Sequence, residues 1–289
     1  MFVYNLRMVI ISLILRILSN PIANVFQKKL TSKYSTFIVN SITYGGLCLL
    51  ILPMILKTDF ASLNHTIWLY GVVGGLFGAL GNAFLVKALS LGDLSILGPI
   101  NSYKSVVAMI FGIFLLGEIP SLAGILAVGL VIWGSYFVFD TTDEKFSLAL
   151  FKRKDIIYRF MALVFTALEA IMIKRVILLS DINISFIFWC GFGFLFSLLF
   201  ALLKQEKAQL PEIKSSLQFI GLISMFGLMQ YTTNYVFQNM NVSYALALFQ
   251  LSSVVNVIFG YKFFKETQVK KKLVGTIIMI IGAAIIICS

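Results

Sequence analysis

Apolar segments long enough to cross a lipid bilayer follow one another along almost the whole chain of 289 residues. A transmembrane helix needs about 20 consecutive, mostly apolar residues, and the loops between these segments are short and polar. A transmembrane β-barrel would instead show weak alternating segments of about ten residues. The sequence therefore predicts an all-α polytopic membrane protein of about ten transmembrane helices, at 8–27, 35–56, 66–86, 94–116, 120–139, 157–178, 183–203, 217–238, 243–264 and 270–288.

Composition excludes a soluble domain and a nucleic-acid-binding protein. The mean hydropathy is +0.97, 60% of the residues are hydrophobic and 12% are charged. The net charge of +11 comes from basic residues scattered among the loops, with no basic domain to carry them. We therefore expect the lipid bilayer, and no nucleic acid, as a partner. The first segment has Arg16 in its middle and no small-residue cleavage site, so we expect a retained helix.

The basic residues are distributed unevenly between the two sides of the predicted bundle. Loops after the first, third, fifth, seventh and ninth helices hold 17 lysine and arginine residues, Arg159 counted among them, and the other side holds 4. The positive-inside rule places the richer side in the cytoplasm and both termini outside.

Signatures of enzymes, metal sites and nucleotide hydrolysis are absent from the sequence. Cys48, Cys190 and Cys288 lie in apolar segments without a C-x-x-C pair, which indicates packing. His65 is the single histidine, and neither a G-x-S-x-G elbow nor a phosphate-binding G-x-x-x-x-G-K-[ST] loop occurs. We expect no catalysis, cofactor or metal, and any transport must draw its energy from gradients.

An internal repeat organises the chain. The letters SVVAMIFG at 105–112 return as SVVNVIFG at 253–260, and residues 82–139 align with 230–287 at a constant offset of 148. A weaker match at an offset of 146 joins the front halves and pairs Lys28-Lys29 with Lys174-Arg175. The sequence thus divides into a first repeat at 1–139, a connecting loop at 140–156 and a second repeat at 157–289.

Each repeat holds five helices, and five is an odd number. The second repeat must therefore enter the membrane from the opposite side, so the two are inverted repeats. Secondary transporters use such pairs for alternating access to a site between the halves. Duplication kept only for packing is the alternative.

The back half of each repeat resembles a known family. GDLSILGPINSYKSVVAMIFGIFLLGEIPSLAGILAVGLVIWG and NVSYALALFQLSSVVNVIFGYKFFKETQVKKKLVGTIIMIIG are similar to the end of the EamA repeat of the drug/metabolite transporter superfamily. In that pattern an acidic residue and a later glycine recur, here Glu118 with Gly134 and Glu266 with Gly282, although Lys265 stands where Gly117 stands in the first copy. The resemblance implies ten helices, metabolite efflux or exchange and, in commonly drawn topologies, cytoplasmic termini. Such motifs mark the fold and not the substrate.

Three ionisable residues lie deep in the predicted membrane segments: Arg16, Lys104 and Glu169. A charge at the bilayer centre costs at least about 2.5–3.5 kcal/mol, so a functional role is the default interpretation. The alternative is an internal structural pair between Glu169 and one of the cations. Because the counterpart of Lys104 in the second repeat is Ser252, the scaffold does not need a cation there. We therefore predict that Lys104 meets an anionic group of the substrate.

Polar side chains at helical spacing suggest a cavity around these charges. Amides suit ligand recognition and also serve as interhelical contacts. Together with Lys104, Arg16 and Glu169, the predicted substrate-binding residues are Asn20, Asn24, Gln27, Asn101, Tyr103, Gln230, Tyr231, Asn234 and Tyr235; Gln250 and Asn256 add further amides.

Two other groups of residues are assigned structural roles. Glu118 and Glu266 sit at helix ends, where an acid is favoured by the dipole of the helix that follows, so Glu169 is the better candidate for proton coupling. The glycines of YGVVGGLFGALGN at 70–82 are spaced as in close helix contacts.

Two functions from different classes follow. The first is a secondary transporter that exports or exchanges a small polar metabolite, amino-acid-like or anionic, in a bacterial cytoplasmic (inner) membrane. The second is a flippase for a lipid-linked sugar or headgroup. A soluble substrate would compete for binding in detergent without lipid, and a lipid substrate would not.

Overall fold

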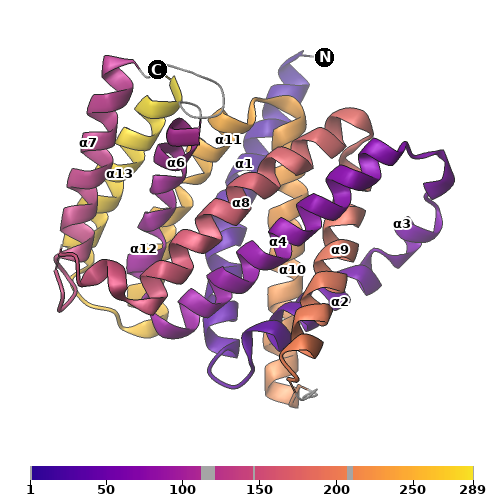
Figure 1. Ribbon diagram of the computed structural model, residues 1–289, viewed down its shortest axis with the longest axis horizontal. Helices are drawn as coiled ribbons and strands as arrows, with labels where there is room; N and C mark the ends of the chain where they lie inside the picture. The colour runs from indigo at the N-terminus through magenta and orange to yellow at the C-terminus, as the bar shows by residue number, and fades with distance from the viewer. Residues whose placement is uncertain (1, 112–120, 146, 207–210, 289) are drawn as a thin grey trace.

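The computed structural model describes residues 2–111, 121–145, 147–206 and 211–288, which form helices joined by short connections, with no β-strand in these ranges. The all-α class is confirmed for this part of the chain (Figure 1). The helices of the first half are α1 (Phe2–Leu30), α2 (Thr36–Leu50), α3 (Leu52–Leu56), α4 (His65–Leu91), α5 (Leu94–Leu97), α6 (Tyr103–Phe111) and α7 (Leu122–Phe139). Those of the second half are α8 (Lys154–Leu179), α9 (Ile182–Leu203), α10 (Ile213–Asn239), α11 (Val242–Phe249), α12 (Ser252–Phe264) and α13 (Val269–Cys288).

All ten segments expected from hydropathy contain helix, but fewer of them are long and apolar enough to span a bilayer. Within the described residues, six stretches meet both conditions: Leu6–Leu30, His65–Leu91, Leu122–Phe139, Lys154–Leu179, Ile182–Leu203 and Tyr244–Phe264. Thr36–Leu50 is apolar but shorter. The count of ten spans stays a prediction.

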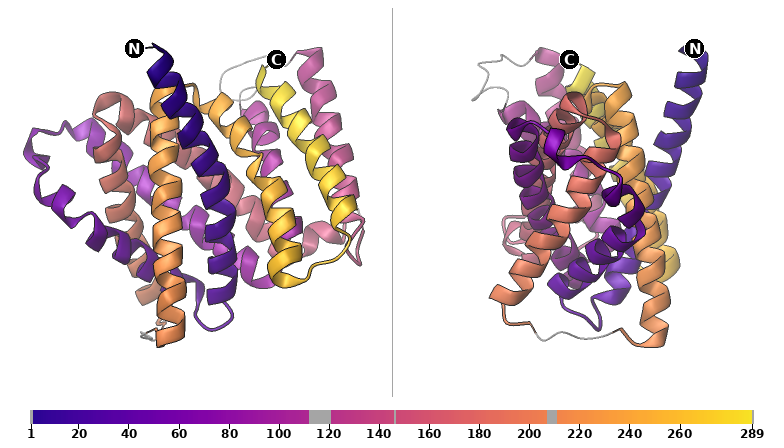
Figure 2. Two further views of the ribbon diagram at one scale, coloured as in Figure 1. Left: turned by 180° about the vertical axis from the view of Figure 1, so that it is seen from behind. Right: turned by 90° about the vertical axis from the view of Figure 1, so that its right-hand side faces the viewer.

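The two halves run in opposite directions. Both termini lie at one end of the molecule; α1 and α4 run away from that end, whereas α8 and α10 run toward it (Figures 1 and 2). Several connections rich in lysine and arginine, at 28–35, 140–154 and 262–272, lie at the opposite end, which we call the basic end.

Helix packing repeats across the two halves. α4 packs against α8 and α1 packs against α10, while α7–α13 and α2–α9 are contacts between equivalent helices. In the α7–α13 contact, a Cβ atom on Gly134 would lie 2.7 Å from the carbonyl oxygen of Gly275, and one on Gly282 would lie 2.8 Å from that of Ala127. Gly134 and Ala127 are the counterparts of Gly282 and Gly275 at the offset of 148, so one contact is made twice.

Helix ends are capped in the same duplicated manner. Lys28 donates a hydrogen bond to the carbonyl oxygen of Gly92, the C-cap residue of α4. Its counterpart Lys174 donates to the carbonyl oxygens of Phe237 and of Met240, the C-cap residue of α10, with a distance of 3.4 Å for Met240. Cations stabilise the carbonyl groups at helix C-termini. The pairing of Lys28 with Lys174 in the sequence therefore reflects a shared structural role.

The segments expected as continuous helices at 94–116 and 243–264 are interrupted. The first divides into α5, the 3₁₀ turn Pro99–Ser102 and α6, and the second divides into α11 and α12 at Gln250 and Leu251. The two long pieces start within one residue of the same register, α6 at Tyr103 and α12 at Ser252, the counterpart of Lys104. Pro99 lacks the N–H group that a continuous helix needs. Broken helices in a membrane protein occur where the backbone is buried in protein or lines a cavity.

The glycines of α4 allow close packing on two neighbouring helices, as expected. A Cβ atom on Gly75 would lie 2.2 Å from Cβ of Phe192 in α9, and one on Gly81 would lie 2.6 Å from Thr166 in α8. Cys190 lies in the hydrophobic core and Cys48 packs against it, and both are free thiols. The side chain of Cys288 falls outside the described part of the structure.

Candidate functional site

A cavity of about 120 Å³ lies between the two repeats, and both halves contribute to its lining. Its polar lining comes from α1, α4, α8, α10, α12 and the interrupted helix at 94–111. Seven of the twelve predicted substrate-binding residues line it: Arg16, Asn20, Asn24, Asn101, Lys104, Glu169 and Gln230.

Lys104 is the second residue of α6, directly after the helix break. Its side chain is 7% exposed, and it makes no hydrogen bond or salt bridge with any described residue. Its counterpart Ser252 lines the same cavity, donates to the carbonyl oxygen of Phe249 at 2.7 Å and is 3.4 Å from the side-chain nitrogen of Asn20. The serine is thus engaged with protein groups, whereas the ammonium group is available to a ligand.

Arg16 contributes a second cation from the middle of α1. Its Nε donates to the hydroxyl of Thr233 at 2.9 Å, and its guanidinium lies 4.5 Å from the ring centroid of Phe249. The nitrogen Nη1 is buried without a hydrogen-bond partner. Because such a donor is costly to leave unsatisfied, Arg16 has capacity for one further acceptor in the cavity.

Arg159 is a cavity residue that the sequence analysis assigned to a loop, and the structure corrects this assignment. It lies within α8 and is 7% exposed, donating from Nε to the carbonyl oxygen of Leu97 at 2.7 Å and from Nη2 to Oδ1 of Asn101 at 2.9 Å. Asn101 in turn donates to Oε1 of Gln250 at 2.9 Å, which connects the two helix breaks. Arg159 therefore stabilises the helix break near Pro99 and, through Asn101, is connected to the break at Gln250. Arg159 lies within the predicted helix 157–178, which could have shown that it belongs to a helix, but it was counted among the basic residues of the loops.

Glu169 is the acidic group of the cavity. Its Oε1 accepts a hydrogen bond from Nε1 of Trp189 at 2.7 Å, and it packs against Gly78, where a Cβ atom would lie 2.3 Å from Oε1. No salt bridge within 4.0 Å joins Glu169 to Arg16 or Lys104 in the described structure. In this conformation Glu169 therefore does not form the direct ion pair with Arg16 or Lys104 that the sequence allowed as an alternative.

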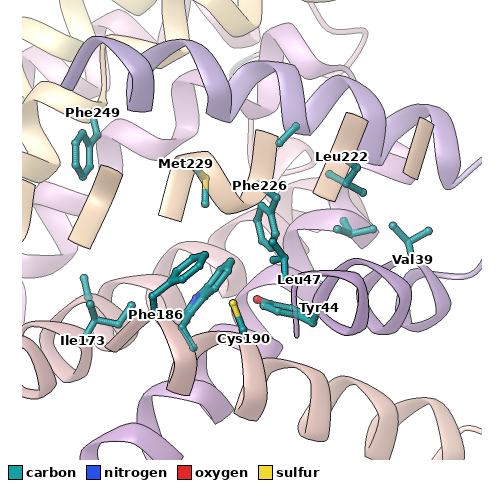
Figure 3. Close-up of a cluster of buried hydrophobic side chains, with 14 of the residues drawn as sticks. Val39, Tyr44, Leu47, Ile173, Phe186, Cys190, Leu222, Phe226, Met229 and Phe249 are labelled. Carbon is teal, nitrogen blue, oxygen red and sulfur yellow. The ribbon is translucent and has the colours of Figure 1, made fainter. Parts of the chain in front are cut away.

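Aromatic side chains form the wall of the cavity next to Glu169. The rings of Tyr44 and Trp189 have centroids 5.0 Å apart, as have those of Trp189 and Phe226. Figure 3 shows Tyr44 and Phe226 facing each other, with Met229 and Phe249 further along the same core. A carboxylate among aromatic faces suits a cationic group. The cavity thus holds the cations Lys104, Arg16 and Arg159 together with one carboxylate, Glu169, which lies beside aromatic rings.

The amides of α1 divide between the cavity and the protein interior. Asn24 lines the cavity and donates to Oδ1 of Asn256 at 3.2 Å. Gln27 lies outside the lining and donates to Oδ1 of Asn82 at 3.1 Å, and Asn82 donates to Oδ1 of Asn40 at 2.9 Å. These amides therefore also join α1 to α2, α4 and α12.

Four more predicted residues lie outside the lining. Asn234 is buried and accepts from Gln230 at 2.9 Å. Tyr231 is 41% exposed and donates to Asn183 at 3.2 Å, because its position next to Gln230 turns it to the outside of α10. Tyr235 does not reach the cavity, and the hydroxyl of Tyr103 pairs with Ser135 at 2.8 Å.

Glu266 has a structural role, but at a different helix from the one expected. Its carboxylate accepts hydrogen bonds from the backbone N–H groups of Leu94 and Ser95, both at 2.8 Å, and so caps α5 of the other repeat. Lys272 donates to the hydroxyl of Ser95 at 2.8 Å. Glu118 lies outside the described residues.

The charges of the cavity break the symmetry of the repeats. At the offsets of 146 and 148, the counterparts of Arg16, Lys104, Arg159 and Glu169 are Ala162, Ser252, Leu13 and Ala23. None of these four counterparts is charged. The repeat supplies the scaffold, and each charge stands in one repeat only: Arg16 and Lys104 in the first, and Arg159 and Glu169 in the second.

Comparison with known proteins agrees with this architecture. A search of curated proteins finds no match. A solved structure, described as the crystal structure of a protein, is similar over 93% of this chain and 95% of its own, with 16% sequence identity and a TM-score of 0.63. At that identity the likeness shows the fold alone.

The sequence matches one family twice, over residues 7–140 and 153–288. The two matches correspond to the two inverted halves and leave only the connection near 141–152 and the chain ends unmatched. With its apolar helices, its duplicated architecture and these matches, the chain is a membrane transport protein that belongs to the EamA-like transporter family.

Proposed function

We propose that the protein is a gradient-driven secondary transporter for a small metabolite that carries both an anionic and a cationic group, as an amino acid does. The observation that carries this proposal is Lys104, which is buried at a helix break, has no hydrogen-bond or salt-bridge partner among the described residues and lines a cavity that also contains Glu169. The substrate's anion would bind Lys104 and Nη1 of Arg16, and its ammonium group would bind the carboxylate beside Trp189.

Alternating access is the mechanism that the inverted repeats support. The cavity lies between the halves, and rocking of one half against the other would open it to one membrane face at a time. The glycine contacts of α4 with α8 and α9 give the halves closely packed surfaces for such a motion. Export or exchange across a bacterial cytoplasmic membrane is the direction and location that we propose.

The test is mass spectrometry of medium and cytosol from cells that produce the wild type, Lys104→Met or Lys87→Ala at matched membrane levels. Lys87 is exposed and lies outside the cavity, so its variant controls for loss of a lysine. Loss of a charged hydrogen-bond partner costs about 1.5–3 kcal/mol, or roughly a 10- to 150-fold change in affinity. We expect the wild type and Lys87→Ala to shift the same zwitterionic metabolite, and Lys104→Met to shift it at least tenfold less.

Equal metabolite profiles for the wild type and Lys104→Met would contradict the proposed site. If none of the three proteins shifts a soluble metabolite while reconstituted wild type scrambles a labelled lipid, the function is that of a lipid flippase and the proposal fails.

A further inference from the structure

A second pocket, of about 480 Å³, opens at the basic end and shares no lining residue with the central cavity. It lies between the C-terminus of α1, the C-terminus of α4, the N-terminus of α10 and the end of α12. We call it the headgroup pocket; its lining includes Lys29, Lys33, Ser90, Ser215 and Gln218. None of its lining residues is acidic.

The N-terminus of α10 gives this pocket its first anion-binding feature. The first backbone N–H groups of a helix have no intrahelical acceptor and carry the positive end of the dipole. At the start of α10 the side chain of Glu212, the N-cap residue, makes no capping hydrogen bond. The helix is 27 residues long, so its dipole is fully developed.

Ser215 provides an independent second feature. Its side chain is 3% exposed and lines the pocket, and its hydroxyl makes no hydrogen bond with a described residue. The amide of Gln218, one turn further along the same face of α10, is equally free and lines the same pocket. Two uncommitted polar groups therefore project from the helix that presents its N-terminus to the pocket.

Lysines complete the site. Lys28 is already bound to the carbonyl oxygen of Gly92. The side chain of Lys29 makes no hydrogen bond or salt bridge with a described residue, and its Nζ lies 5.0 Å from the ring centroid of Phe263. Lys33 forms a salt bridge with Glu212 at 2.8 Å, and the two side chains are 52% and 68% exposed. Exposed pairs contribute little to stability, so Lys33 can turn toward a ligand. The pocket combines ammonium groups, free side-chain donors and a helix N-terminus, which is the chemistry that binds phosphate.

The surface around the pocket favours a lipid as the source of that phosphate. Ile213 and Leu217, on the outer side of α10, are 89% and 69% exposed, and Phe263 is 43% exposed. These apolar groups lie next to the polar pocket, as acyl chains lie next to a headgroup. Basic pockets between membrane helices on the cytoplasmic side bind anionic lipid headgroups. We infer that the headgroup pocket binds the phosphate of an anionic phospholipid.

Native mass spectrometry of the purified full chain tests this inference without reference to transport. The protein is titrated with phosphatidylglycerol, with phosphatidylcholine of the same acyl chains, and with inorganic phosphate. Variants Lys29→Ala and Ser215→Ala remove pocket donors. Lys87→Ala and Ser216→Ala are the matched controls, because both residues are near the same end of the molecule but do not line the pocket.

We expect saturable binding of phosphatidylglycerol that phosphatidylcholine does not reproduce. A lysine near an anionic lipid surface contributes about 1 kcal/mol, and a hydrogen bond contributes about as much. Each pocket variant should therefore bind about fivefold more weakly, and each control within about twofold of the wild type. Lys29→Gln, which keeps most of the side-chain stem over Phe263, should give the same loss if Lys29→Ala lowers the yield of folded protein.

Three outcomes would overturn the inference. Equal binding of the two lipids would show that the phosphate diester alone, without net charge, is enough. If millimolar inorganic phosphate binds the protein and displaces the lipid, the pocket would belong to a soluble anion. Unchanged lipid binding in both pocket variants would place the lipid elsewhere.

Discussion

Lys104 and Ser252 occupy equivalent positions in the two inverted repeats, 148 residues apart, and both line the same cavity. The serine donates a hydrogen bond to the last residue of α11, whereas the lysine makes no hydrogen bond or salt bridge with any described residue. Equivalent positions at the two helix breaks therefore hold a satisfied hydroxyl in one repeat and an unsatisfied cation in the other. The comparison shows that the fold accepts an uncharged residue at this position, and that the lysine adds a positive charge to the cavity.

Replacing Lys104 with methionine should lower transport and raise stability. A buried cation without a partner destabilises the folded state, and an apolar side chain of similar length removes that cost. We expect the midpoint of thermal unfolding in detergent to stay equal or rise by a few degrees while transport falls at least tenfold. A large loss of thermal stability would instead identify Lys104 as a structural residue.

Replacing Glu169 with glutamine should separate zwitterionic from purely anionic substrates. The amide keeps an oxygen to accept the hydrogen bond from Trp189, but the negative charge disappears. We expect transport of a zwitterion to fall at least tenfold, and transport of a matched analogue without the ammonium group to change less than threefold, since loss of a charged contact costs about 1.5–3 kcal/mol. Equal losses for both compounds, measured in proteoliposomes, would argue against an ammonium subsite.

The duplicated helix caps should have similar energetic effects. Lys28→Met and Lys174→Met each remove the cation that binds carbonyl oxygens at the end of α4 or α10, while keeping the apolar stem. We expect each to destabilise the protein by about 1–2 kcal/mol. Lys29→Met and Arg175→Met, at the adjacent positions, serve as controls. Destabilisation by only one of the two cap variants would show that the ends are not equivalent.

Two glycines of α7 should respond oppositely to alanine. At Gly134 the added Cβ would lie 2.7 Å from the carbonyl oxygen of Gly275, whereas at Gly129 it would meet nothing within 4 Å. We expect Gly134→Ala to destabilise the protein by about 1–3 kcal/mol and Gly129→Ala to be neutral or stabilising by up to about 1 kcal/mol. Thermal unfolding of both variants in the same detergent provides the measurement.

The contact between Asp140 and Lys271 should make stability depend on pH at the basic end. The hydrogen bond from Lys271 lowers the pKa of Asp140 below its ordinary value of 3.8. A carboxylate with a lowered folded pKa stabilises the protein above its unfolded pKa, and that contribution is lost as the pH falls through the folded value. The difference in unfolding temperature between the wild type and Asp140→Asn should therefore be present at pH 6, shrink as the pH falls below 3.8 and disappear once the pH is below the folded pKa. A difference that persists at low pH would show that Asp140 acts as a cap of α7 rather than through its charge.

Hydropathy and repetition in the sequence were enough to find the helical regions, because each apolar run contains helix among the described residues, but they did not show where two of the runs are interrupted. The break at Gln250 and Leu251 was not predictable from local chemistry, since no glycine or proline marks it. Pro99 marks only the break of the first repeat, and its own counterpart, Ala247, lies inside α11. Alignment of the repeats did show from sequence alone that Lys104 is a cation at a position where the other repeat has a serine.

The part of the site that the sequence did not reveal depends on helix rotation. Arg159 was counted with the loops because it lies near the start of its segment, yet α8 turns it toward Leu97 and Asn101. Tyr231 follows Gln230 directly, and the single step of about 100° around the helix moves it to the outside. Which face of a membrane helix meets a cavity is set by its neighbours, and hydropathy does not contain that information.

The separation between duplicated caps and unduplicated charges also bears on how such a transporter could change its cargo. Lys28, Lys174 and the glycines of α7 and α13 fix the architecture in both halves, while the ionic character of the cavity rests on four positions whose counterparts are alanine, serine and leucine. New specificity can therefore arise by substitutions at these few unpaired positions, two in each half, without altering the contacts that the two halves share.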